Sequence, residues 1–459
     1  MATNQVVGSG DTPPVYKIDL SLPPSQRYAE LARKYCTQLQ SLTSLFDELV
    51  LAVQPSISLA WVKRLARLCF RNLYTYEETE EIKGISKVTG IKVYLLVALN
   101  VLLDPLMGCT SGAALSRQPN ESQTKMLHFR TLDWGMDSLR KLVVQLDFVR
   151  SPEHDKVIAT SVTYVGYVGV LTGVRKGLSV SLNFRPNHVL GSAFAECRFY
   201  LSHLLVLLGI RQSISSLLRQ YVLPPPEPPR SLFGRFFKRK SQNATLHYDA
   251  SVDRIIATLP SIPTTAAYLI FCDGTKSLVM QKDHRSAVTS TSSSFIVATN
   301  TDLQTSSPSC ETREGAHSGA GSATIMADAI LDSTERRTIM EAFWDKKVNE
   351  TQRTRNYERR GHQHSRLQEC VSRNTPRNAR ASEVDTYEPN SVGRTNSLEA
   401  LEPPSARDNP AEITTSLSEL VEWTSTYPVT SEVTHFTAIM DPLEGKVLWV
   451  RRYLCHLRI

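Results

Sequence analysis

The spacing of apolar residues changes at residue 109, and this change limits the fold more than any other feature of the 459-residue chain. Before residue 109, apolar side chains recur at helical spacing, as in residues 28–50 and 58–73. After it they alternate, as in residues 142–148, and Val, Thr and Tyr are frequent between 157 and 184. The sequence therefore predicts an α+β fold in which a helical N-terminal segment precedes a series of strands.

Both patterns return later in the chain. Residues 203–221 resume helical spacing, while residues 268–271 and 295–298 have the composition of strands. Near the C-terminus, residues 434–440 and 446–453 are typical of two strands joined by a turn that contains Pro and Gly. This hairpin predicts that the end of the chain closes the same sheet as the earlier strands.

The net charge of +7 is concentrated in one polar stretch. From Asp345 to Arg380, ten Lys and Arg residues stand against four Asp and Glu residues, which gives +6. The low apolar content of residues 346–412 predicts a disordered basic insert, although the same charge also suits a patch for anionic lipid or nucleic acid. We expect four parts: a helical segment at 1–108, a main domain at 109–345 with loop insertions near 222–245 and 303–330, the insert at 346–412, and a C-terminal helix and strands at 413–459 that complete the main domain.

The cysteines do not indicate a metal site or a disulfide scaffold. None of the eight pairs at Cys-x-x-Cys spacing, and no His lies at a ligand offset, so we expect no zinc site. Residues 1–11 lack the apolar core of a signal peptide, and the longest apolar run, 94–103, is too short to cross a bilayer. The simplest prediction from these features is a cytoplasmic protein.

Cys109 is the residue with the most specific chemistry. If the chain is cut before it, Cys109 carries a thiol and a free α-amine on the same carbon. The amine, with a reference pKa of about 8, can act as a base for the thiol, whose reference pKa is about 8.5. Arg130 is a candidate cation to lower the thiol pKa, Asp133 can orient the amine, and Asn300 can donate to an oxyanion.

These residue types alone leave the question open, because a single Cys is more often a small buried apolar residue. Single Arg and Asp residues near strand ends are more often surface ion pairs. A series of short motifs runs in one order along nearly the whole chain: Pro13 to Pro24, Glu80 to Ile85, Cys109-Thr110-Ser111, Arg130-Thr131-Leu132-Asp133-Trp134, Gly169 to Gly177, Leu182-Asn183-Phe184-Arg185, Thr299-Asn300-Thr301-Asp302 and Glu335-Arg336-Arg337-Thr338. This ordered series resembles the acid ceramidase and N-acylethanolamine acid amidase family of N-terminal nucleophile hydrolases.

The resemblance implies a four-layer αββα sandwich and a site of five residues. Cys109 would be the nucleophile, freed by autocleavage after Gly108, with Arg130 and Asp133 beside it. Asn300 would contribute to the oxyanion hole. Arg336, which aligns better than Arg337 with the first Arg of the family's pair, would complete the site.

The same resemblance implies a cysteine amidase that hydrolyses ceramide or N-acylethanolamine, works without a cofactor and forms a heterodimer of its own two fragments. It implies a lysosomal or vacuolar location, unlike the cytoplasmic one expected from the first residues. No nucleic acid partner is expected, whereas a transient contact with a membrane surface is. The helix at 203–221 suits an acyl-chain channel or a membrane, but its pattern is more often that of ordinary core packing. The basic aromatic residues 233–240 suit a membrane surface or, slightly better, a solvated loop.

Departures from the family pattern keep a second hypothesis open. Phe184 stands where the family has Glu, Thr301 replaces an aromatic residue, and residues 303–330 are largely an insertion. A catalytically silent lipid-binding or scaffold protein on the same fold fits these changes. A bile-salt or penicillin acylase fits less well, because those enzymes begin close to their nucleophile.

Overall fold

The structure, a computed structural model, describes residues 11–43, 46–47, 58–102, 108–118, 123–151, 156–185, 201–223, 251–302, 332–357 and 413–454. The chain divides into one unit of Met1–Trp344 with Thr414–Ile459 and a second unit of Asp345–Ile413. In the second unit, residues 345–357 are helical. All elements below belong to the first unit.

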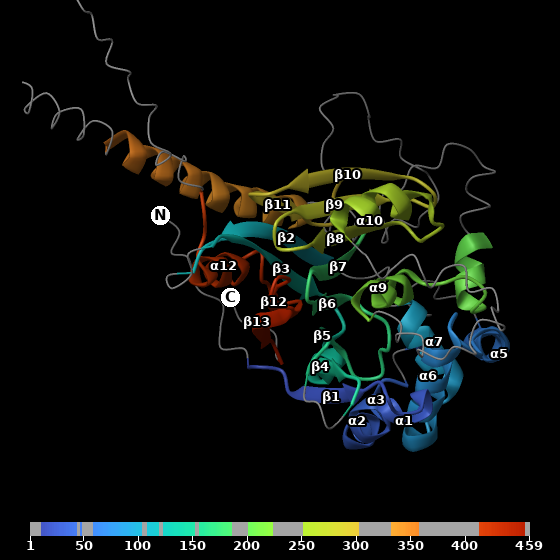
Figure 1. Cartoon of the computed structure of the whole chain (residues 1–459). Helices are drawn as coiled ribbons and strands as arrows, with labels where there is room; N and C mark the ends of the chain where they lie inside the picture. The colour runs from blue at the N-terminus through green and yellow to red at the C-terminus, as the bar shows by residue number, and fades with distance from the viewer. Residues whose placement is uncertain are drawn as a thin grey trace, which may run out of the picture. The chain divides into compact units, whose positions relative to one another are not determined.

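Two β-sheets form the centre of the first unit (Figure 1). The larger sheet has the order β1 (Val15–Asp19), β4 (Val143–Val149), β5 (Ala159–Tyr164), β6 (Thr172–Arg175), β7 (Leu178–Phe184), β8 (Ala267–Cys272), β9 (Ser277–Lys282) and β10 (Ala287–Ser292). The smaller sheet has the order β11 (Phe295–Ala298), β2 (Gly108–Ser116), β3 (Lys125–Asp133), β12 (Thr434–Asp441) and β13 (Lys446–Arg452). Neighbouring strands are antiparallel, except that β1 runs parallel to β4.

The alternation of side chains along β3 shows how the two sheets pack. His128 and Arg130 point toward β7 of the larger sheet, where His128 lies between the hydroxyls of Ser179 and Ser181. Leu127 and Phe129 point the other way, into a cluster with helical residues of the opposite layer. Because side chains on a strand alternate between its faces, one strand supplies both the apolar outer core and the polar groups between the sheets. Burial lowers the pKa of His128 to about 3, so its ring is neutral.

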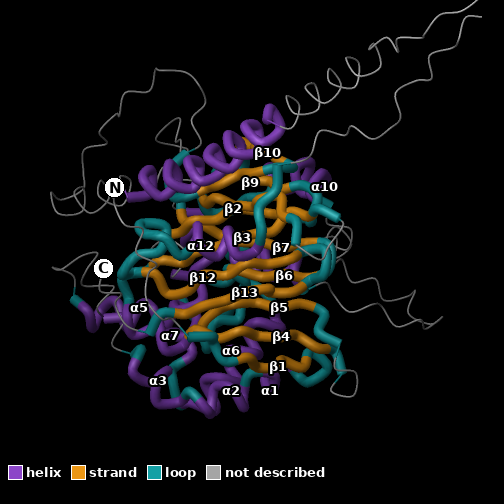
Figure 2. Tube along the Cα trace, turned by 90° about the vertical axis from the view of Figure 1, so that its left-hand side faces the viewer, coloured by secondary structure: helices purple, strands orange, loops and turns teal. Residues whose placement is uncertain are grey.

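Helices cover the outer faces of both sheets, which gives the order helix, sheet, sheet, helix (Figures 1 and 2). α12 (Leu417–Thr424) and helical residues 332–344 pack on the smaller sheet. On the side of the larger sheet lie α9 (Ile214–Val222) and α10 (Val252–Thr258), followed by the helices of the N-terminal segment: α1 (Pro24–Arg27), α2 (Ala29–Lys34), α3 (Cys36–Ser41), α5 (Leu59–Cys69), α6 (Tyr76–Thr89) and α7 (Val93–Leu102). Two short 3-10 helices lie at Asp137–Leu142 and Leu259–Ser261. The predicted α+β class is confirmed.

Local signals explain where the longer helices begin and end. The side chain of Thr75 accepts a hydrogen bond from the Glu78 N–H at the start of α6, and Gly90, with φ 74°, ends that helix. Ser416 and Glu419 form a capping box at the start of α12.

Several expectations from the sequence need correction. In the described residues 28–43, the helical pattern forms short separate helices rather than one, and the segment before residue 109 also contributes β1 to the larger sheet. The helical pattern of residues 203–221 is interrupted at Gly209, whose φ of 67° is left-handed. β9 and β10 were not predicted. The C-terminal hairpin and the strands at 268–271 and 295–298 are confirmed.

The expectation of an unstructured stretch at 346–412 is wrong for its first residues, which are helical to residue 357. No Gly or Pro interrupts residues 332–357, and Lys346 and Glu350 pair at helical spacing, 4.0 Å apart. Residues 358–412 lie outside the described residues, as do most of the expected insertions near 222–245 and 303–330.

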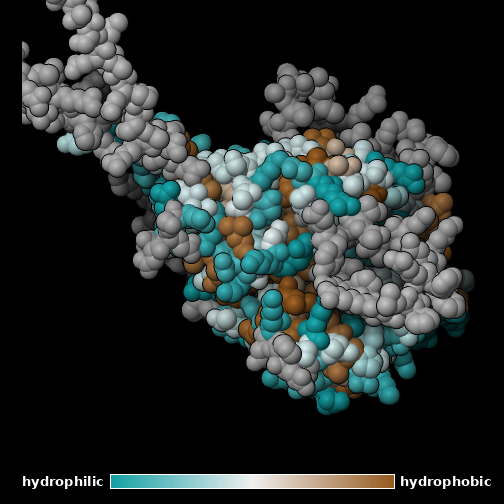
Figure 3. All heavy atoms as spheres, viewed as in Figure 1, coloured by the Kyte–Doolittle hydropathy of each residue, from teal (hydrophilic) through white to brown (hydrophobic). Residues whose placement is uncertain are grey.

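On the face that Figure 3 shows, the described residues form no broad apolar surface. In Figure 3, hydrophobic residues form small separate patches among hydrophilic ones. Within the described ranges, no helix is both long and apolar enough to cross a membrane.

Candidate active site

Cys109 lies near the start of β2, with its side chain between the two sheets. Its sulfur is 3.8 Å from the Leu182 carbonyl oxygen of β7, and its backbone N–H donates to Asn300 Oδ1 at 2.8 Å. The residue is fully buried in the uncut chain. Burial raises the pKa of the Cys109 thiol, and the nearby positive charge of Arg130 only partly opposes this effect.

Arg130 faces the same space from β3, opposite Ser111 in the strand register. Its Nη1 donates to Leu182 O and Asn183 Oδ1, both at 2.6 Å, and to Ser111 Oγ at 3.2 Å. Its Nε and Nη2 donate to no group in the part of the chain that the structure describes. The buried guanidinium is therefore held through one nitrogen.

Asp133 lies at the end of β3, directly opposite Gly108. Its Oδ1 accepts from Thr434 Oγ1 at 2.6 Å, and its Oδ2 is 3.1 Å from Arg336 Nη1. A Cβ atom on Gly108 would be 3.2 Å from the Asp133 Cβ. The carboxyl group therefore lies against the Gly108–Cys109 peptide.

Arg336, which belongs to helical residues 332–344, lies among the side chains around Cys109, whereas its neighbour Arg337 does not. It is 2% exposed and donates to Thr110 Oγ1 at 2.9 Å and to Asn300 Oδ1 at 3.2 Å. Arg337 instead donates to the Asp302 carbonyl oxygen at 3.0 Å, away from Cys109.

Asn300 follows β11 and contacts the start of β2 through its oxygen. Oδ1 accepts from the Cys109 N–H and from Arg336, while Nδ2 donates to the Phe184 carbonyl oxygen at 2.7 Å. In the uncut chain, Asn300 is thus a hydrogen-bond acceptor for the nitrogen that cleavage would turn into an α-amine. The structure brings together all five residues that the sequence singled out: Cys109, Arg130, Asp133, Asn300 and Arg336.

Sequence reasoning assigned no role to three further residues in this cluster. Ser111 and Asn183 stand inside motifs of the family resemblance, which was the signal that could have found them. Thr434 is brought to Asp133 by the pairing of β12 with β3, and no local pattern marks it. Among the described residues, no group of three or more His, Cys, Asp and Glu side chains could hold a metal ion.

The chain is similar to several known proteins. Residues 11–74 match the family model described as the beta subunit of N-acylethanolamine-hydrolyzing acid amidase. The chain is 31% identical over 193 residues to the N-acylethanolamine-hydrolyzing acid amidase of Caenorhabditis elegans, covering 39% of this chain and 50% of that protein. It is 30% identical over 189 residues to the acid ceramidase of Rattus norvegicus, covering 38% and 45%. Over about two fifths of its own length, the chain is thus similar to both acid ceramidase and N-acylethanolamine-hydrolyzing acid amidase.

The similarity to this family has limits. The chain spans about half the length of the curated relatives it matches. A solved structure of the Caenorhabditis elegans N-acylethanolamine-hydrolyzing acid amidase ortholog aligns with a TM-score of 0.40 and 15% identity, over 75% of this chain and 100% of that one.

Phe184, a departure from the family pattern, contacts Cys109 and Asn300 through its backbone. Its backbone carbonyl oxygen accepts the hydrogen bond from Asn300 Nδ2. A backbone group makes this contact, so the Glu-to-Phe difference leaves the support of Asn300 in place.

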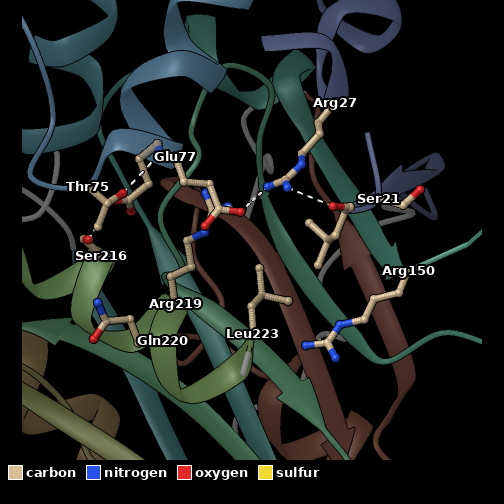
Figure 4. Close-up of a pocket in the computed structure, with 11 residues that line it drawn as sticks. Ser21, Arg27, Thr75, Glu77, Arg150, Ser216, Arg219, Gln220 and Leu223 are labelled. Carbon is tan, nitrogen blue, oxygen red and sulfur yellow. Dashed lines mark hydrogen bonds and ion pairs between the residues drawn. The ribbon is translucent and has the colours of Figure 1, made fainter. Parts of the chain in front are cut away.

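A cavity of about 340 Å³ lies elsewhere, where the segment before residue 109 meets α9 (Figure 4). It is lined by Leu20, Ser21, Arg27, Thr75, Glu77, Glu78, Arg150, Ser216, Arg219, Gln220 and Leu223. None of the five site residues is among them, so this cavity is separate from the thiol. Beside it, Arg219 of α9 pairs with the buried Glu81 of α6, with Nη2 and Oε1 2.7 Å apart.

The raised pKa of the Asp133 carboxyl predicts that the stability of the folded chain depends on pH. Burial raises the pKa of its carboxyl to about 6, although Arg336 and Thr434 oppose the change. Because the folded chain binds this proton more tightly than the unfolded chain, the stabilisation is complete below pH ~4 and is lost as the pH rises through about 6. A shift of this size corresponds to roughly 3 kcal/mol. In Asp133→Asn, the difference in unfolding free energy between pH 4 and 7, measured with urea, should shrink by about that amount.

The control for this prediction is Asp332→Asn, which also removes a carboxylate partner of Arg336 but at a half-exposed position. Its pH dependence should stay close to that of the unmodified chain. Equal slopes in the two variants would show that Asp133 does not carry the effect.

Proposed function

We propose that this chain is a cysteine amidase of the N-terminal nucleophile type that hydrolyses the amide bond of N-acyl lipids. The observation that supports this proposal is the arrangement around the Gly108–Cys109 peptide. The nitrogen of Cys109 donates to Asn300, the carboxyl of Asp133 lies beside Gly108, and Arg336 bonds to both of these side chains.

The first step is cleavage of the chain before Cys109. The thiol attacks the Gly108 carbonyl carbon and its proton passes to the departing nitrogen, so that the peptide C–N bond breaks and the Cys109 α-amine is freed. Water then hydrolyses the thioester, which releases the Gly108 carboxylate and regenerates the thiol. Gly108 has no side chain to clash with Asp133 at 3.2 Å. Since the sulfur is buried in the uncut chain, we propose that separation of residue 108 from residue 109 also opens the site to substrate.

The second step is turnover of the lipid amide. The α-amine takes the thiol proton, the thiolate attacks the amide carbonyl, and the amine then gives that proton to the leaving amine. Water resolves the resulting thioester to a fatty acid. In this proposal Asn300 and Asp133 hold the α-amine, Arg130 favours the thiolate, and Asn300 also contributes to the oxyanion hole.

The proposed substrate class rests on what two relatives are called, acid ceramidase and N-acylethanolamine-hydrolyzing acid amidase. We propose ceramide or an N-acylethanolamine as substrate and a heterodimer of residues 1–108 and 109–459 as the active form. The experiment is intact-mass measurement of purified protein, followed by a panel of fluorescent N-acyl amides assayed at acid and neutral pH. A full-length chain without thiol-dependent hydrolysis, even after acid incubation, would favour a silent lipid-binding protein.

A contact with a membrane surface is a separate part of the proposal. Residues Ile214, Leu217 and Leu218 of α9 are buried, so this part of the 203–221 pattern is core packing. On α5, however, Trp61, Leu65 and Leu68 are 69%, 53% and 62% exposed at positions that share one helical face. Arg64 and Arg67 on the same helix are also exposed, which suits anionic headgroups. Residues 233–240 lie outside the described residues.

Co-sedimentation with anionic vesicles tests the contact. The double variant Trp61→Ser, Leu65→Ser should lose binding, whereas Tyr76→Ser on α6, also an exposed aromatic position, should retain it. Equal binding by both variants would exclude α5 as the contact.

A further inference from the structure

Consecutive residues of β7 contact most of the side chains in the proposed site from the opposite sheet. The Leu182 carbonyl oxygen is 3.8 Å from Cys109 Sγ and 2.6 Å from Arg130 Nη1. The Phe184 carbonyl oxygen accepts from Asn300. Between them, the side chain of Asn183 faces the same space and is fully buried.

Asn183 uses both ends of its amide. Its Oδ1 accepts from Arg130 Nη1 at 2.6 Å and from Ser111 Oγ at 2.7 Å. Its Nδ2 donates to the carbonyl oxygens of Ala298 at 3.0 Å and Thr299 at 3.4 Å, which directly precede Asn300. One side chain therefore links the guanidinium next to the sulfur with the backbone that carries Asn300.

We propose that Asn183 is a positioning residue for the thiol chemistry, which holds the Arg130 guanidinium beside Cys109 and fixes the approach of Asn300. This inference rests on the proposed function, because it gives Asn183 a role in that reaction. Three contacts fix Arg130, all through Nη1, and Asn183 supplies one of the two shortest. Nε and Nη2 have no partner among the described residues, so they do not hold the group in place.

The side chain of Asn183 carries no charge, and this affects how strongly Arg130 acts on the sulfur. An acceptor of this shape that carried a negative charge would compensate the guanidinium and weaken its effect on the sulfur. Of the groups that lower the Cys109 thiol pKa, Arg130 has the largest effect. A neutral amide thus fixes the position of the cation and leaves its charge to act on the thiol.

If Asn183 only stabilised the fold, its loss would affect the thiol no more than the loss of another inter-sheet hydrogen bond. Another residue of β7 provides the matched control for this comparison. Ser181 lies on the same face of the strand, is fully buried, and bonds across the sheets to His128 Nε2 at 2.9 Å. Ser181→Ala also removes an inter-sheet hydrogen bond from β7, but it does not touch Arg130.

The experiment compares Asn183→Ala with Ser181→Ala by the NMR titration of ¹³Cβ-labelled cysteine, with the Cys109 signal assigned by its loss in Cys109→Ala. In Asn183→Ala the titration midpoint of the Cys109 thiol should rise by about one pH unit, and kcat should fall by about 100-fold, since misplacing a catalytic group by ~1 Å has this effect. Ser181→Ala should leave both unchanged. Equal midpoints in the two variants would overturn the proposal.

A second variant keeps the test decisive if Asn183→Ala does not fold. Asn183→Asp preserves the size and the acceptor for Arg130 but compensates its charge, so the thiol midpoint should rise here too. An unchanged midpoint in this variant would overturn the inference. Both titrations are independent of turnover, so an unmodified chain that hydrolyses no amide would refute the proposed function and leave the role of Asn183 to be judged by the titration.

Discussion

Replacement of Cys109 by alanine is expected to abolish both cleavage of the chain before residue 109 and hydrolysis of N-acyl amides. The proposed mechanism uses the same sulfur for both reactions, and no other cysteine lies in the site as the structure describes it. Removal of the nucleophile reduces kcat by roughly 10⁶-fold in a serine protease, which also forms a covalent acyl-enzyme. Intact-mass analysis should therefore show a single full-length species, and initial rates should fall to the level of the buffer.

Cys272 provides the matched control for this variant. It is also fully buried, and its sulfur lies 3.8 Å from the Met126 carbonyl oxygen, within an apolar cluster. Burial raises the pKa of its thiol to about 12. Cys272→Ala should keep both cleavage and hydrolysis, while Cys109→Ser should cleave slowly because a hydroxyl is the weaker nucleophile. Normal cleavage in Cys109→Ala would remove the basis for the proposed function.

The alternating pattern of the sequence predicted the strands around Cys109, whereas the set of five site residues was implied by the family resemblance. Because side chains alternate along β3, an Arg at 130 and an Asp at 133 must lie on opposite faces of one strand. Arg130 accordingly reaches Asn183 of the larger sheet, whereas Asp133 meets Arg336 from the helical layer. Hydrophobic periodicity and turn residues also predicted the C-terminal hairpin that places Thr434 next to Asp133.

Contacts between segments that are distant in the sequence could not be predicted from local patterns. Asn183 meets Arg130 only because two sheets pack face to face, and nothing near residue 183 indicates which strand it will oppose. The orientation of Asn300 is a further example. Its oxygen faces the Cys109 nitrogen because the Phe184 carbonyl oxygen accepts from its NH₂ group. Local sequence can predict that an amide is present, but its hydrogen-bond partners decide which end points at the site.

Polar residues between the two sheets show a second reason why the sequence alone did not predict these contacts. Burying His128 and Arg130 is costly unless partners are supplied, and these partners come from β7 through Ser179, Ser181 and Asn183. In a single sequence, such residues look like solvent-facing positions of a half-exposed strand. Only the second sheet turns them into an internal polar layer.

The substitution Glu81→Gln is expected to cause a large loss of stability. Glu81 is 1% exposed, and its Oε1 is 2.7 Å from Arg219 Nη2 and 3.1 Å from Arg27 Nη1. Without the charge of Glu81, Arg219 keeps Glu77 as an ion-pair partner at 3.9 Å, so the buried guanidinium is only weakly compensated. Loss of one partner of a buried ion pair costs about 3–5 kcal/mol. Urea unfolding of the uncut Cys109→Ala chain, with and without Glu81→Gln, measures this difference. After cleavage, the same substitution should make residues 1–108 dissociate more readily, because Glu81 and Arg219 would then belong to different fragments.

An exposed ion pair of nearly the same length separates the effect of burial from that of charge. Lys276 and Asp253 are 2.9 Å apart, but their side chains are 38% and 79% exposed. Water already stabilises both groups, so Asp253→Asn should cost no more than about 1 kcal/mol. Since the two pairs differ little in distance, a much larger loss for Glu81→Gln can be attributed to the charge that remains in the interior. Similar losses would mean that Arg27 and Arg219 find other compensation, and that strand pairing between β1 and β4 holds the N-terminal segment in place.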